Sequence, residues 1–96
     1  MELKPSRYFL EQLDGLSDKT LSIVDSKLKL IEANPFRFKR LYFPGLQLFR
    51  IPINDRNKEL RLIYLVENKL VTLLFFLYRK NDYSELRKKL KLLGYL

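Results

Sequence analysis

The sequence predicts an α+β fold in which an N-terminal helical hairpin packs on an antiparallel sheet of three or four strands, followed by a C-terminal helix. Three observations support this. Apolar residues recur every three or four positions over residues 6–33. They alternate or run continuously over residues 46–78, as in strands. Leucines return to helical spacing over residues 86–93. The 96 residues contain no visible repeat or low-complexity tract, so one domain spanning residues 1–96 is expected.

Two helices are expected near the N-terminus. The first covers residues 6–13, and Gly15 is expected to end it in the left-handed conformation. The second starts after Ser17, a good N-cap, and ends before Pro35, because the residue before a proline is pushed out of the helical region. Its apolar residues are spaced by three, four and three positions: Leu21, Val24, Leu28 and Ile31.

Three strands are expected in the following half of the chain. The alternation in LQLFRIPI, residues 46–53, predicts a half-buried strand. Pro52 lacks a donor N–H, which predicts that this is an edge strand. Residues 60–66 form the next strand. Residues 70–78 are apolar at both odd and even positions, as expected of a strand buried on both faces.

Turn residues predict the connections between these elements. Residues 36–45 mix aromatic and basic side chains and are expected to be irregular, and residues 54–58 form a polar loop. Asn68, which tolerates positive φ, predicts a tight turn between the last two strands. Residues 2–4 are an optional extra strand.

The last helix is expected to begin at an N-cap formed by Asp82 or Ser84 and to end at Gly94. Its buried side carries Leu86, Leu90 and Leu93. Its outer side carries Arg87, Lys88, Lys89 and Lys91.

The charge indicates an acidic partner. Nineteen lysines and arginines against eleven acids give a net charge of +8, which attracts phosphates, acidic proteins or anionic membrane surfaces. The chain has no cysteine or histidine, so neither a thiolate metal site nor the usual neutral-pH proton shuttle is available. Its acids are too scattered for a two-metal site. No metal or other cofactor is therefore expected.

The sequence also predicts a soluble, cytoplasmic protein with no membrane contact. The first ten residues, MELKPSRYFL, lack the apolar core of a signal peptide. The longest apolar run, residues 70–78, is too short to cross a bilayer as a helix.

Four residues are candidates for chemistry. Arg50, Arg61 and Arg79 lie on or at the end of the three predicted strands, and Tyr83 follows Arg79 by four positions. Side-chain parity allows the arginines to converge on one face but does not require it, and three separate solvated arginines are the alternative. Tyr83 could attach the last helix to the sheet, or it could transfer protons, since neighbouring cations favour the phenolate.

Five further cations are candidates for RNA binding. They are Arg37, Lys39, Arg40, Lys80 and Lys88. A loop of basic and aromatic residues suits a phosphate backbone and stacked bases. The alternative is an ordinary solvated surface.

Several short motifs together resemble the RelE/ParE superfamily of toxins over nearly the full length. They are EANPF at the end of the helical pair, LFRIPI, LRLIYLV, and a strand that ends in a basic pair before a tyrosine. The resemblance implies a RelE-like fold and a ribosome-dependent mRNA interferase, an endoribonuclease that inhibits translation. It also implies partners: the ribosome, mRNA, and an acidic antitoxin of the RelB kind in a toxin–antitoxin hetero-oligomer.

The resemblance further implies roles for individual residues. Arg61 and Arg79 would bind the scissile phosphate, Arg50 would position it or transfer a proton, and Tyr83 would act as general acid–base or stack on a base. The reaction would be a metal-free in-line attack by the 2′-hydroxyl. Lys80 would be an additional cation.

Two positions depart from the pattern of the family. Pro52 stands where ribosome-dependent members have a second basic residue, and Tyr78 replaces a histidine. The alternatives are a ParE-like inhibitor of DNA gyrase without nuclease activity, and a non-catalytic nucleic-acid-binding module. The antitoxin is expected to cover the arginines together with their apolar neighbours Ile63, Phe75 and Leu77.

Overall fold

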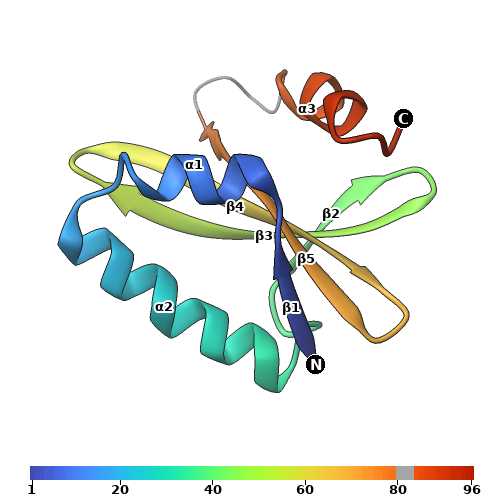
Figure 1. Cartoon of the computed structure of the whole chain (residues 1–96), viewed down its shortest axis with the longest axis horizontal. Coiled ribbons are helices and arrows are strands. Elements are labelled where there is room, and N and C mark those ends of the chain that lie inside the picture. The colour runs from blue at the N-terminus through green and yellow to red at the C-terminus, as the bar shows by residue number, and fades with distance from the viewer. Residues whose placement is uncertain (80–83) are drawn as a thin grey trace.

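The computed structural model describes residues 1–79 and 84–96. A first strand, β1 (Glu2–Pro5), precedes helices α1 (Arg7–Leu13) and α2 (Asp18–Ala33). Four strands and a helix follow: β2 (Lys39–Phe43), β3 (Leu46–Asp55), β4 (Lys58–Glu67), β5 (Leu70–Tyr78) and α3 (Leu86–Leu92). Within the described residues the strands form one sheet in the order β1-β5-β4-β3-β2, with β1 parallel to β5 and the other pairs antiparallel (Figure 1).

The chain is α+β, but the predicted N-terminal helical hairpin on an antiparallel sheet of three or four strands is wrong. A strand comes before the helices, and in the described part of the chain the sheet has five strands and is mixed. The optional strand at residues 2–4 is present as β1, and it pairs parallel to β5. Residues 39–43, expected to be irregular, form β2 because Leu41 and Phe43 turn one way while Arg40 and Tyr42 turn the other.

Two clusters of buried side chains cover the two faces of the sheet. The first contains Phe9 of α1 and Val24 and Ile31 of α2, and the second contains Leu86 and Leu90 of α3. Successive residues of β4 alternate between them, so this strand is buried on both faces. On the first face, buried Tyr64 donates its hydroxyl to the carbonyl of Pro35 at 2.6 Å, and burial raises its pKa.

Strand β5 is apolar at odd and even positions alike because both of its faces are buried, and its pairing with β4 contains an irregularity. Ile63 pairs with Phe75, but the next residue, Tyr64, pairs with Leu73, so Leu74 is an extra residue. Leu74 and Phe75 both belong to the cluster of α3. The bulge therefore changes which positions of β5 face each layer.

Residues at the start of α1 and within it continue the hydrogen bonding of β5 where β1 ends. The backbone N–H of Ser6 donates to the carbonyl of Leu73 at 2.8 Å, and its hydroxyl donates to that of Leu74. Further along, the amide of Gln12 donates to the carbonyl of Phe76 at 3.0 Å and accepts from its N–H at 2.8 Å. These bonds satisfy backbone groups that β1 is too short to reach.

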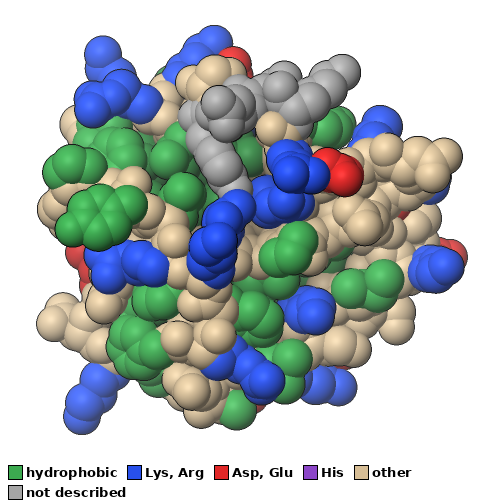
Figure 2. Space-filling model, turned by 180° about the vertical axis from the view of Figure 1, so that it is seen from behind, with side chains coloured by type: hydrophobic (Ala, Val, Ile, Leu, Met, Phe, Trp, Pro, Cys, Tyr) green, Lys and Arg blue, Asp and Glu red, His purple; other side chains and the backbone are tan. Residues whose placement is uncertain are grey.

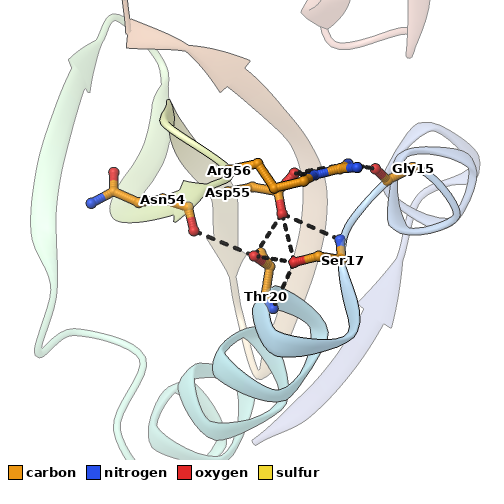
Figure 3. A network of polar contacts seen from close by, with 6 residues as sticks. All are labelled: Gly15, Ser17, Thr20, Asn54, Asp55 and Arg56. Atoms are coloured by element: carbon orange, nitrogen blue, oxygen red, sulfur yellow. Dashed lines mark hydrogen bonds and ion pairs between the residues drawn. The ribbon is translucent and has the colours of Figure 1, made fainter.

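A buried carboxylate joins the end of β3 to the start of α2 (Figure 3). Asp55 is 2% exposed and accepts from the hydroxyls of Thr20 and Ser17 at 2.7 and 2.9 Å, and from the N–H of Ser17 at 3.2 Å. Arg56 pairs with its other oxygen at 3.2 Å and donates to the carbonyl of Gly15 at 2.6 Å. The hydrogen bond from Thr20, followed by those from Ser17 and Arg56, outweighs desolvation and lowers the pKa of Asp55.

Some of the predicted caps and turns are confirmed, and others need correction. Gly15 is not in the left-handed conformation, because α1 ends through right-handed Asp14. Ser17 does cap α2, and Asn68 has a φ of 54° in the turn before β5. The loop predicted at residues 54–58 is shorter, because Arg56 and Asn57 supply positive φ for a tight turn.

Strand β3 is not the edge strand predicted from Pro52, because β2 pairs outside it. That pairing ends at Lys39 opposite Arg50, two residues before Pro52. A proline is tolerated there because β2 has no residue opposite it to lose a hydrogen bond.

Leu86 and Leu90 of the last helix are buried as predicted, whereas Leu93 is its C-cap and is only partly buried. Glu85 occupies the N-cap position of α3, so Ser84 is not the cap, and Asp82 lies outside the described residues. Gly94 ends the helix with a φ of 90°. Among the helices in residues 1–79 and 84–96, none is long and apolar enough to cross a membrane.

Replacing the N-cap of α2 tests the junction between helix and sheet. We expect Ser17→Ala to lower the free energy of unfolding by about 1 kcal/mol, because Ser17 accepts from the N–H of Thr20 at 3.2 Å. Urea unfolding measures this. Ser26→Ala in the same helix is the control and should change it little, because the hydroxyl of Ser26 is exposed. Equal losses in both variants would contradict the role of Ser17.

The lowered pKa of Asp55 predicts acid-sensitive stability. Its contribution is complete above the ordinary pKa of 3.8 and is lost as the pH falls through the lower pKa of the folded state. The difference in unfolding free energy between the wild type and Asp55→Asn should therefore shrink as the pH falls below 3.8. Asp25→Asn, which removes an exposed pairing with Lys29, should differ little from wild type at any pH. A constant difference for Asp55→Asn would refute the prediction.

Candidate nucleic-acid interface

The strand register brings Arg50, Arg61 and Arg79 to one face of the sheet. Arg61 shares its side of β4 with Ile63, which pairs directly with Arg50 of β3. Arg61 also pairs with Leu77 of β5, and Arg79 follows Leu77 by two positions. Residues related in this diagonal way lie about 7–8 Å apart. Of the two arrangements that parity leaves open, the register therefore supports the one in which the three arginines share a face of the sheet.

A fourth cation extends this row to the sheet edge. Lys39 of β2 pairs with Arg50, so its side chain leaves the same face. We call Lys39, Arg50, Arg61 and Arg79 the basic face. Figure 2 views the molecule from behind, and Lys and Arg side chains are far more common than acidic ones on the surface that it shows.

The members of the basic face differ in their surroundings. Arg61 is half-buried, lies opposite Pro52 and donates to the carbonyl of Leu60 at 3.2 Å. Arg50 is also half-buried and makes contacts of its own. Arg79 is exposed and pairs with the carboxylate of Glu59 at 3.0 Å. Both groups of that pair are more than half exposed, so a phosphate can compete for Arg79 at low cost.

Helix α3 covers the neighbouring part of the same face. Ile63, Phe75 and Leu77, which were expected to be open to an antitoxin, are buried in the cluster of α3. That expected apolar border is therefore wrong. Exposed Pro52 and Asn54 mark part of the face that α3 leaves open.

The other predicted RNA-binding residues do not all join the basic face. Arg40 leaves the opposite face of β2, where its guanidinium lies 5.8 Å from the ring of Phe49. Arg37 precedes β2, is exposed and lies 5.7 Å from the ring of Phe38. Lys88 is exposed on α3. Lys80 and the predicted catalytic Tyr83 lie outside the described residues.

Lys89 does not lie on the outer side of α3 as predicted. It is half-buried, and its ammonium lies 5.7 Å from the ring of Tyr8 and 5.9 Å from that of Phe75. Such contacts stabilise a cation over an aromatic face. Lys89 therefore helps to attach α3 to α1 and to the sheet.

The chemistry available on the basic face is that of phosphate binding. Guanidinium groups present several donors in a fork that matches phosphate oxygens, and an ammonium adds a point charge. In the described ranges no group of three acidic, histidine or cysteine side chains is placed to hold a metal ion. The face can thus neutralise a phosphate backbone through its cations.

Comparison with protein-family models, with curated proteins and with solved structures finds no significant match to this chain. The resemblance to the RelE/ParE toxins stays a prediction, and the candidate site rests on the geometry above.

The register changes the meaning of two residues, Lys39 and Glu59. Lys39 was assigned to an irregular loop, although the alternation of Lys39, Leu41 and Phe43 is a period-two signal. Glu59 was not considered, although it lies two positions before Arg61 on the same strand. The signal was available in both cases, but the register was needed to show its meaning.

Removing Glu59 tests whether the basic face binds RNA. We expect Glu59→Gln to bind a single-stranded RNA decamer about two- to fivefold more tightly at low salt, because it releases Arg79 from an exposed ion pair. Fluorescence anisotropy of labelled RNA measures the affinity. Glu67→Gln, the same charge change at the other end of β4, is the control. A similar gain in both variants would show an effect of net charge alone.

Proposed function

We propose that the protein is the toxin of a toxin–antitoxin pair and cleaves mRNA on the ribosome. One observation supports this above the others: Lys39, Arg50, Arg61 and Arg79 share one face of the sheet. These are the three arginines that the RelE/ParE resemblance assigns to the reaction, with one additional cation. The face suits a substrate whose phosphate gains negative charge during the reaction.

The proposed reaction is an in-line attack of a ribose 2′-hydroxyl on the adjacent phosphorus. The bond from the 2′-oxygen to phosphorus forms, the bond to the 5′-oxygen breaks, and a 2′,3′-cyclic phosphate and a 5′-hydroxyl result. Arg61 and Arg79 stabilise the charge on the phosphate oxygens. A guanidinium keeps its proton at neutral pH, so positioning is the role for Arg50, and the resemblance gives proton transfer to Tyr83.

The half-buried state of Arg61 supports its place at the scissile phosphate. Its backbone lies in β4, a strand buried on both sides, and its guanidinium is already held by the carbonyl of Leu60. A cation that is fixed before the substrate arrives loses less conformational entropy on binding it. Arg79, in an exposed ion pair, is more adaptable and suits the approach of the RNA.

The proposed partner that controls the toxin is an acidic antitoxin. The net charge of +8 and the basic face provide complementary charge for an acidic segment that folds on binding. Such a segment would compete directly with RNA for Arg50 and Arg61. The proposal includes the cytoplasm as the location, since ribosomes and messages are the targets.

Inhibition of DNA gyrase is the second candidate, and Pro52 favours it. Pro52 lies on the basic face directly opposite Arg61, at the position where the resemblance has another basic residue. A face with one cation fewer would bind phosphate without completing the cleavage site. This candidate predicts inhibited supercoiling with intact messages.

Message cleavage in a translation extract tests the proposal. We expect the wild type to cut mRNA within the ribosomal A site and Arg61→Ala to lower the cleavage rate about 100-fold or more, because one stabilising donor is lost. Primer extension maps and quantifies the cuts. Arg61→Lys should recover part of the rate, since it keeps the charge but loses the fork of donors.

Lys19→Ala on α2 is the matched control, because Lys19 is an exposed cation that lies on a helix of the opposite layer. It should cleave at the wild-type rate. Intact messages at equimolar toxin and ribosome would overturn the proposal, as would full activity of Arg61→Ala. Supercoiling assays on the same preparations then test the gyrase candidate.

A further inference from the structure

We propose that the hairpin of β2 and β3 holds a binding site for one unpaired nucleobase, on the sheet face opposite the basic face. The site consists of Tyr42, Arg40 and Gln47. The site rests on the proposed function, because that function makes the nucleic acid RNA. It deepens that function by adding an RNA contact outside the proposed cleavage site.

The three side chains come together through the register of the hairpin. Tyr42 pairs directly with Gln47, and Arg40 precedes Tyr42 by two positions on the same side of β2. The guanidinium of Arg40 donates to the carbonyl of Leu46 at 3.3 Å, which holds it across the hairpin. They line a hollow of about 320 Å³ together with residues 43–46, and the turn is closed by Gly45 with a φ of 78°.

The exposure of Tyr42 supports a binding role for its ring. Its side chain is 88% exposed, although Phe49 on the same face is buried. In Figure 1 the β2–β3 hairpin extends away from α1 and α2, so in the described structure these helices do not cover its end. An exposed aromatic ring that lines the same hollow as a guanidinium offers a surface on which another flat ring can stack.

Charge favours a nucleic acid over an apolar protein partner at this hairpin. Residues 33–54 contain no acidic residue, whereas they contain four cations: Arg37, Lys39, Arg40 and Arg50. Because β2 is an edge strand, Lys39 leaves it toward the basic face and Arg40 toward the hollow. An RNA strand that passes this edge can therefore meet cations on both faces of the sheet.

The chemistry of the hollow matches the recognition of a single base. The ring of Tyr42 supplies the stacking surface, and Arg40 supplies donors to base or phosphate oxygens. The amide of Gln47 offers one donor group and one acceptor, which can pair with the edge of a base. A double helix hides its bases within the stack, so the occupant is an unpaired nucleotide.

Binding of a fluorescein-labelled, single-stranded RNA decamer of mixed sequence tests this site. We expect Tyr42→Leu to weaken binding about tenfold, because a stacked base is lost, and Tyr42→Phe to stay within about twofold of wild type, because the ring is kept. Arg40→Gln should weaken binding more than the control Lys19→Gln, which removes one positive charge at another exposed position. Because Tyr42 is exposed, its replacement should leave the fold intact. The thermal midpoints of the variants check this.

The results separate this site from the cleavage site. Wild-type affinity in Tyr42→Leu overturns the base-binding site, whatever the outcome of the message-cleavage assay, and leaves the hairpin open to a protein partner. Tenfold weaker binding by Tyr42→Leu, with Tyr42→Phe unaffected, supports it even if the wild type cuts no message. A loss in Tyr42→Phe equal to that in Tyr42→Leu also overturns it, because stacking would not be the cause.

Discussion

The burial of β4 on both faces is the constraint on which the rest of the structure depends. Leu62, Ile63, Tyr64 and Leu65 are fully buried in succession, so each face of the sheet must be covered. Burial of apolar surface stabilises the fold by roughly 25 cal/mol per Å². A sheet with one face exposed to water would therefore lose much of the stability that so small a domain has. Helices α1 and α2 cover one face, and the seven residues of α3 cover part of the other. Polar and charged residues occupy the remainder of that second face, and the basic face lies there.

The helices are attached to this sheet by polar contacts as well as by apolar packing. Gln12 and Ser6 complete the hydrogen bonding of β5, and buried Asp55 joins the end of β3 to the N-terminus of α2. A carboxylate at the start of a helix also interacts favourably with the helix dipole. On the second face, the ammonium of Lys89 lies over the rings of Tyr8 and Phe75 and so connects α3 to α1 and to the sheet. Each contact joins residues distant in sequence, which restricts how the layers can slide over one another.

The arginines of the candidate site could be named from the sequence, but their arrangement could not. Parity showed which neighbours Arg50, Arg61 and Arg79 have within each strand, whereas their common face depends on the register between strands. The bulge at Leu74 changes that register within β5, and a continuous apolar run carries no sign of it. Lys39 was grouped with Arg40 as part of one basic loop. Because adjacent residues of a strand point to opposite faces, the two belong to different surfaces.

The sequence by itself determined the α+β class, the N-cap at Ser17, the turn at Asn68, the strands of the meander and the buried leucines of α3, because each depends on a local period or on one residue's backbone preference. The tertiary structure decided the rest. It added β1 and β2 to the sheet, placed β3 inside the sheet despite Pro52, and buried the apolar neighbours of the arginines under α3. Strand pairing and layer contacts join distant parts of the chain, and no local pattern encodes which partner each edge or face receives.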